Sequence, residues 1–149
     1  MNIPHAAGRI PAALHSAGVD LVDLRRWELA LARCGEGLAR RYFAPQERCV
    51  ARELATAERG FAEILGHLFG VKESVVKVVG GLPPTARLAD IHVEIPADGN
   101  DKQPWTVRLC GPLGEWARAE RLDVVGASTP LESGMALAWA ATQDAGPRA

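Results

Sequence analysis

The spacing of apolar residues changes halfway along this chain of 149 residues, and that change constrains the fold more than any other feature. Over residues 58–79 the apolar side chains recur at helical intervals, and a glycine pair followed by a proline pair at 80–84 ends the helix. Beyond residue 89 apolar and polar residues alternate, as they do in half-buried strands. The sequence therefore predicts an α+β domain with helices packed on one side of a largely antiparallel sheet.

The remaining elements follow from the same two patterns. Asp23 is a suitable N-cap for a first helix, and Pro45 suits the first turn of a second, where it loses no hydrogen bond. The unbroken apolar run at 134–141 has no polar face, so it predicts a strand buried on both sides, by the core or by a subunit partner. In chain order we expect a strand at 17–22, helices at 24–38, 46–57 and 58–79, strands at 89–95 and 104–110 joined by a turn at 97–100, a helix at 113–121, and strands at 122–127 and 134–141.

One folded unit accounts for nearly the whole sequence. A chain of 149 residues that is 48% hydrophobic can build a single core without disulfides or a structural metal. We expect a flexible N-terminal leader at 1–16, the single domain at 17–142 and a frayed tail at 143–149. The leader lacks the apolar core and basic start of a signal peptide, and no apolar run approaches the roughly 20 residues that cross a bilayer. No membrane partner is expected.

The bulk charge argues against a general nucleic-acid binder, because 17 basic residues face 18 acidic ones. Cys34, Cys49 and Cys110 are odd in number and widely spaced, which favours reduced thiols over a disulfide framework or a zinc site. The four histidines have no metal-ligand spacing, so surface or core packing is expected for each, with His67 the exception worth testing. Together these features favour a cytoplasmic protein.

Charged residues stand out where they interrupt apolar elements, because such charges usually have a partner or a ligand. Lys72, Glu73 and Lys77 interrupt the long helix, and Asp20 interrupts the first strand. Glu73 and Lys77 share a helical face, whereas Lys72 points about 100° away. Spacing alone favours an ordinary ion pair between Glu73 and Lys77. The alternative is a magnesium site, since Mg²⁺ often takes one or two carboxylates together with phosphates and water.

The same residues lie in two motifs that resemble those of the holo-(acyl-carrier-protein) synthases, the small 4'-phosphopantetheinyl transferases. The family's first strand reads roughly G-x-D-I-V-E-I, and residues 18–24 here read G-V-D-L-V-D-L. Its long helix reads R-F-A-x-K-E-A-x-x-K-A-x-G, and residues 68–80 read L-F-G-V-K-E-S-V-V-K-V-V-G. The similarity continues through 38–47 and 89–93, and residues 102–104 (K-Q-P) resemble the family's G-K-P turn.

The resemblance implies an enzyme. Such proteins move the phosphopantetheine arm of coenzyme A to a serine of an acidic acyl carrier protein, in fatty-acid or polyketide pathways, and release adenosine 3',5'-bisphosphate. It implies Asp20 and Glu73 as ligands of Mg²⁺, with the pyrophosphate of coenzyme A completing the metal's shell. Glu73 and Lys77 are then the expected catalytic residues. Lys77 also becomes an expected phosphate contact, with a weaker one from Lys72.

The resemblance also implies contacts made by other segments. Gly80 and Gly81 would let backbone amides approach the nucleotide, although a glycine pair alone is more often a helix stop. Arg26 and Arg33 match the positions at which family members meet the carrier protein, whereas without the resemblance they describe a solvated helix face. Family members form homotrimers with sites between subunits, so we expect the same assembly here.

Three positions depart from the family's pattern. The family's arginine before the phenylalanine is Leu68 here, which leaves His67 as the nearby polar substitute for a contact to coenzyme A. The glycine-threonine-glycine loop is shortened at 80–82. The late strand, where some members carry a histidine proposed as base, reads A-S-T at 127–129, and no histidine lies there. Glu73 or a metal-bound water could then accept the serine proton. The departures also allow a second hypothesis, a catalytically drifted module of the same fold that binds a carrier protein or coenzyme A.

Overall fold

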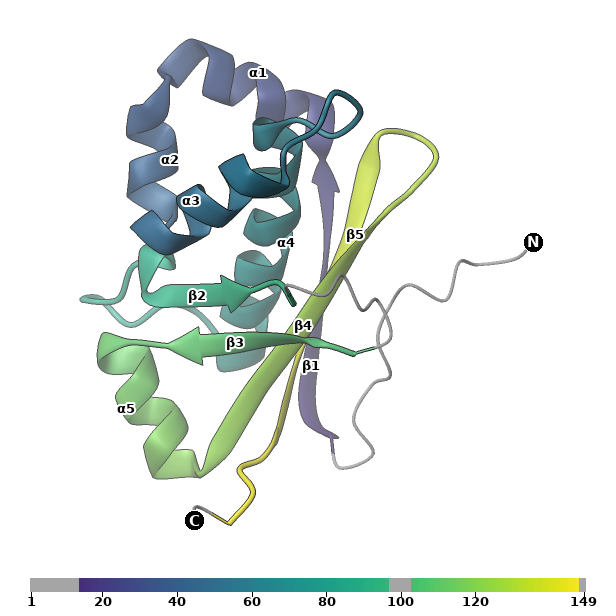
Figure 1. Cartoon of the computed structure of the whole chain (residues 1–149). Coiled ribbons are helices and arrows are strands. Elements are labelled where there is room, and N and C mark those ends of the chain that lie inside the picture. Colours follow the sequence, from purple (N-terminus) through teal and green to yellow (C-terminus); the bar gives the residue numbers. More distant parts are fainter. Residues whose placement is uncertain (1–13, 97–102, 148–149) are drawn as a thin grey trace.

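A computed structural model describes residues 14–96 and 103–147 (Figure 1). Within them, five strands form one antiparallel sheet in the order β1-β5-β4-β3-β2, and helix α4 packs against it. The α+β class and the antiparallel sheet predicted from the sequence are confirmed. The strands are β1 (Leu14–Asp23), β2 (Ile91–Glu94), β3 (Trp105–Leu109), β4 (Leu122–Pro130) and β5 (Met135–Asp144), and the helices are α1 (Leu24–Cys34), α2 (Glu36–Tyr42), α3 (Pro45–Leu54), α4 (Phe61–Val79), the short 3₁₀ turn η1 (Leu88–Asp90) and α5 (Gly111–Glu120).

The helix boundaries follow the predicted signals closely. The Asp23 carboxylate accepts a hydrogen bond from the backbone N–H of Arg26 at 3.0 Å, so Asp23 is the N-cap of α1. The single helix expected at 24–38 is two helices, because the chain turns at Gly35 between α1 and α2. α4 ends at Gly80, whose φ of 80° lies in the left-handed region that favours glycine.

The sheet extends further at both ends of the chain than the sequence predicts. β1 begins at Leu14, inside the segment expected to be a leader, and β5 continues to Asp144, inside the expected tail. Leu14 pairs with Gln143, and the Nε2 of His15 lies 2.6 Å from a carboxylate oxygen of Asp144. The two strands lengthen together because each supplies the other's backbone partners. Residues 1–13 of the expected leader and the turn expected at 97–100 lie outside the described residues.

β5 is the doubly buried strand that its unbroken apolar sequence predicts. It pairs with β1 on one side and β4 on the other. Ala136, Ala138 and Ala140 have no exposed surface, and Trp139, on the opposite face, is also buried. The small side chains let α4 come close, since a Cβ added to Gly70 would lie only 2.8 Å from the Cβ of Ala138. The main core lies between α4 and the sheet. No helix in the described ranges is long and apolar enough to cross a membrane.

Candidate active site

Asp20, Glu73 and Lys77 meet on the side of α4 that faces β1. The Nζ of Lys77 donates hydrogen bonds to the Oδ1 of Asp20 at 2.7 Å and to the carbonyl oxygen of Val19 at 2.8 Å. Burial raises the pKa of Glu73, the charge of Asp20 raises it further, and Lys77 opposes both effects. Among the described residues, Lys77 forms its ion pair with Asp20 and not with Glu73. The prediction of an ion pair between Glu73 and Lys77, which the spacing alone favoured, is therefore wrong.

Gly18 explains how β1 comes this close to α4. A Cβ added to Gly18 would lie 2.5 Å from the carbonyl oxygen of Ser74 and 3.2 Å from the Cβ of Lys77. No side chain fits into that space. Asp20 lies two residues further along the strand and therefore on the same face of the sheet. The G-x-D motif thus combines a glycine that admits the helix with an acid that meets it.

The carboxylates of Asp20 and Glu73 are both partly exposed, and carboxylates are among the ligands that Mg²⁺ takes. The side chain of Asp20 is 19% exposed and that of Lys77 is 51% exposed. No group of three or more His, Cys, Asp or Glu side chains that could hold a metal occurs at 14–96 and 103–147. Two carboxylates are nevertheless enough for Mg²⁺, which takes its other ligands from water and phosphates. Burial is the main cause of the raised pKa of Glu73, and the charge of Asp20 adds to it; a divalent cation would oppose both effects.

Lys72 does not join this group. Its side chain is fully buried, and its Nζ lies 5.0 Å from the centroid of the Phe43 ring. The ammonium donates to the Oε2 of Glu47 at 2.8 Å and to the carbonyl oxygens of Leu88 and Ile91. Burial lowers the pKa of Lys72, and Glu47 opposes that effect. Because the ammonium is held inside the core, the expected contact from Lys72 to coenzyme A is wrong.

Glu47 is the residue that sequence reasoning missed. It is 4% exposed and accepts three hydrogen bonds, from Lys72 and from the backbone N–H groups of Ala44 at 2.8 Å and Val93 at 3.0 Å. These contacts join α3, α4 and β2 around one buried charge pair. The sequence signal was present, since the P-Q-E triplet at 45–47 is part of the resemblance, but nothing in it indicated a buried role.

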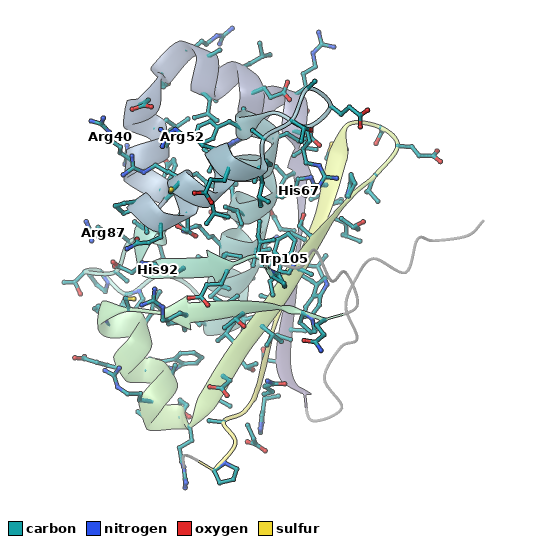
Figure 2. All side chains as sticks on the ribbon, viewed as in Figure 1. Arg40, Arg52, His67, Arg87, His92 and Trp105 are labelled. Atoms are coloured by element: carbon teal, nitrogen blue, oxygen red, sulfur yellow. The ribbon has the colours of Figure 1, made fainter. Side chains whose placement is uncertain are left out.

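His67 does not share a face of α4 with Glu73, since the two residues are about 120° apart around the helix axis, and His67 contacts β4 whereas Glu73 lies beside Asp20 of β1. Figure 2 labels His67 on the side of α4 nearest the strands. Its imidazole is buried, and Nδ1 lies 2.7 Å from the Oγ of Ser128 on β4. The structure therefore does not bring His67 to Asp20, as a contact to coenzyme A beside Asp20 would require. The late strand itself carries no histidine, as its sequence shows, but α4 brings His67 to Ser128 from another element. Leu68, which replaces the family's arginine, is 1% exposed and packs in the core.

Gly80 and Gly81 lie at the end of α4, one turn beyond Lys77. Both are exposed, with φ of 80° and 117°, and a Cβ on either would meet no other atom within 4 Å. Their role as a helix stop is established by this geometry. Their expected contact to the nucleotide stays a prediction, which the open space around them allows.

The arginines expected to meet a carrier protein lie on the outer side of the helices. Arg26 and Arg33 of α1 are exposed. Nearby, Arg40 and Arg52 both donate to the carboxylate of Glu36, at 3.2 Å and 2.7 Å, so this part of the basic surface is partly neutralised (Figure 2). Docking through Arg26 and Arg33 stays a prediction.

Comparison with known proteins gives consistent matches to one family. The model of the 4'-phosphopantetheinyl transferase superfamily matches residues 16–125. A holo-[acyl-carrier-protein] synthase of Methylibium petroleiphilum is 34% identical over 109 residues, which cover 70% of this chain and 78% of the relative. Another, from Polaromonas sp., is 30% identical over 116 residues, covering 74% and 83%. Among solved structures, the holo-[acyl-carrier-protein] synthase of Neisseria meningitidis has a TM-score of 0.72 at 20% identity, covering 88% of this chain and 99% of that one. The Helicobacter pylori synthase in complex with coenzyme A has a TM-score of 0.66 at 18% identity, covering 85% and 99%.

The chain belongs to the 4'-phosphopantetheinyl transferase superfamily, a class of transferase enzymes. Within it, the curated relatives place the chain in the holo-[acyl-carrier-protein] synthase family. The resemblance stated from the G-x-D and K-E-x-x-x-K motifs, and the enzyme class it implied, are thereby confirmed.

Proposed function

We propose that this protein transfers the 4'-phosphopantetheine arm of coenzyme A to a serine of an acyl carrier protein and releases adenosine 3',5'-bisphosphate. The observation that carries the proposal is the group formed by Asp20, Glu73 and Lys77, two carboxylates and an ammonium on one flank of α4. The names of its relatives state this synthase activity, and one solved neighbour is a complex with coenzyme A. These similarities support coenzyme A and an acyl carrier protein as the two substrates.

Transfer at phosphorus depends mainly on positioning the reactants and on neutralising charge. A Mg²⁺ ion held by Asp20 and Glu73 would supply a Lewis acid for the pyrophosphate of coenzyme A. Lys77 supplies a half-exposed ammonium in the same place, already ordered by Asp20 and the carbonyl of Val19, which can bind a phosphate oxygen. Because the pKa of Glu73 is raised, acid removes the charge of this ligand early, so transfer should decline as the pH falls.

The test combines the protein with an apo acyl carrier protein, coenzyme A and Mg²⁺, and measures the mass gain of one phosphopantetheine arm. Asp20→Asn and Glu73→Gln should each lower the rate at least about 100-fold while the circular dichroism spectrum stays that of the wild type. Asp123→Asn, an exposed acid on β4, is the matched control and should keep full activity. No mass gain by the wild type on several acidic carriers would contradict the proposal. Calorimetric binding of coenzyme A in that case would favour the drifted binding module.

We also propose that three subunits assemble and share their sites. β1 is an edge strand, and two of its apolar side chains point away from α4 with large exposed fractions, 55% for Val19 and 59% for Leu21. An exposed apolar strand at a sheet edge is a surface that a second copy can cover. Sedimentation at micromolar concentration should give a trimer, and a monomer would contradict shared sites.

The carrier protein is proposed to dock on Arg26 and Arg33, whose exposed cations suit an acidic partner. Complementary charge mainly raises the association rate and sets orientation. Replacing both by glutamate should therefore raise the KM for the carrier protein and leave the KM for coenzyme A unchanged. Equal effects on both KM values would contradict a docking role.

A further inference from the structure

His67 has a buried ring nitrogen without a hydrogen-bond partner in the part of the chain that the structure describes. The residue is 5% exposed, and its Nδ1 lies 2.7 Å from the Oγ of Ser128. Its Nε2 has no partner among the described residues, since the Oε1 of Glu63 lies 3.9 Å away. Buried polar atoms are nearly always paired, so this nitrogen is a place where a water molecule or a bound group would supply the missing partner.

The hydrogen bond between Ser128 and His67 gives the hydroxyl proton a direct path to the imidazole. Burial, with a further contribution from Arg59, lowers the pKa of His67 to about 4, so the ring is neutral at neutral pH. When the Ser128 hydroxyl donates to Nδ1, the ring proton sits on Nε2 and faces Glu63. A proton taken up at Nδ1 would create a cation beside the Glu63 carboxylate. A hydroxyl hydrogen-bonded to a neutral imidazole is the contact through which a base can take a hydroxyl proton, while Glu63 stays beyond hydrogen-bond distance of Nε2.

Ser128 occupies the same row of the sheet as Asp20. Asp20 pairs with Ala138, and Ala138 pairs with Ser128, so the three side chains point to one face. Two strand spacings, about 10 Å, separate the backbones of Asp20 and Ser128. α4 lies between them, because Gly70 rests on Ala138. One subunit therefore cannot bring Ser128 to its own Asp20.

We propose that Ser128 and His67 form the proton-accepting pair of the transferase and serve the Asp20 and Glu73 site of a neighbouring subunit. This inference rests on the proposed function and on shared sites. In a closed ring of three, each interface joins two different surfaces, which allows the β4 flank of one subunit to meet the β1 flank of the next. It assigns a proton acceptor to a strand that carries no histidine of its own.

The oxygen of the carrier serine forms its bond to phosphorus while its proton passes to the Oγ of Ser128. Ser128 passes its own hydroxyl proton to the Nδ1 of His67. The bond between phosphorus and the bridging pyrophosphate oxygen breaks, and adenosine 3',5'-bisphosphate leaves with the electron pair. The proton on His67 then returns to solvent. In this scheme Ser128 touches the substrate, and His67 acts through Ser128.

Two variants test the pair. His67→Asn keeps an oxygen close to the place of Nδ1, so it can accept a hydrogen bond from Ser128 but cannot take up a proton. Ser128→Ala removes the relaying hydroxyl. Each should lower kcat by about 100-fold or more, with the KM for coenzyme A and the Tm near those of the wild type. Rates within about three-fold of the wild type for both variants would overturn the inference, whereas an inactive wild type would overturn the proposed function instead.

Mixed trimers test whether the pair acts across subunits. Subunits carrying Asp20→Asn are co-assembled in equal amounts with subunits carrying His67→Asn. If each site takes Asp20 from one subunit and His67 from its neighbour, about one quarter of the sites become intact and activity returns to that level. Asp20→Asn mixed with Glu73→Gln is the matched control and should restore nothing, because both residues lie on the same flank. A mixture of the first two variants that stays inactive would overturn sharing of the pair.

Discussion

Replacing Lys72 by methionine separates a structural role from a role in binding coenzyme A. Methionine keeps most of the apolar stem and removes the ammonium. The Glu47 carboxylate, 4% exposed, then loses the cation that neutralises it, and the carbonyl oxygens of Leu88 and Ile91 lose a donor. The structure therefore predicts a large loss of stability that does not depend on any ligand.

The size of the loss follows from the burial of the pair. Removing one partner of a buried ion pair costs about 3–5 kcal/mol, because the other charge stays behind without compensation. A domain of this size has a total stability of only about 5–15 kcal/mol. Since each kcal/mol shifts the Tm by about 2–4 °C, the Lys72→Met variant should unfold roughly 6–20 °C below the wild type.

Urea unfolding followed by circular dichroism measures this cost directly. The matched control is Lys77→Met, which removes a cation that is 51% exposed and should cost less than about 1 kcal/mol while abolishing transfer. The double variant Glu47→Gln with Lys72→Met should recover part of the lost stability, because no charge is then left unpaired. A Lys72→Met protein as stable as the wild type, with a raised KM for coenzyme A, would refute the structural reasoning and restore the expectation drawn from the sequence.

Three further predictions follow from the packing. Gly18→Ala places a methyl group 2.5 Å from the carbonyl oxygen of Ser74, so it should cost about 1–3 kcal/mol in urea unfolding together with most of the activity, and wild-type stability would contradict the close contact. Between pH 6.5 and about pH 4, His67 binds a proton more readily in the unfolded chain than in the folded protein, so the unfolding free energy should fall by up to about 3 kcal/mol as the pH falls. The His67→Asn variant should lack this part of the pH dependence. Identical slopes for the two proteins from pH 4 to 7 would contradict the buried, neutral state of His67. Leu21→Glu places a charge on the apolar outer edge near Val19 and should convert trimers to monomers in sedimentation, whereas intact trimers would exclude this edge as the interface.

The sequence alone predicted those features that depend on residues within a single helix or strand. Apolar spacing, the Asp23 cap and the glycine stop at Gly80 depend on neighbours along the chain, so they predicted the helices, the strands and the α+β class. The unbroken apolar run that became β5 predicted a strand covered on both sides for the same reason. Two motifs, each a few residues long, were enough to indicate the family.

Only the tertiary structure determined which charged side chains are buried in pairs and which stay exposed. Lys72 and Glu73 are adjacent, but a helix turns them about 100° apart, and only the packing shows that one side faces the core and the other faces β1. Lys72 finds Glu47 on α3, and His67 finds Ser128 on β4 across a long stretch of chain. Such pairs depend on strand order, register and the approach of α4, which arise from the whole core together. Local sequence therefore determined which elements form and which residues carry charge, whereas the three-dimensional packing determined which charges are buried in pairs and which stay open to a ligand.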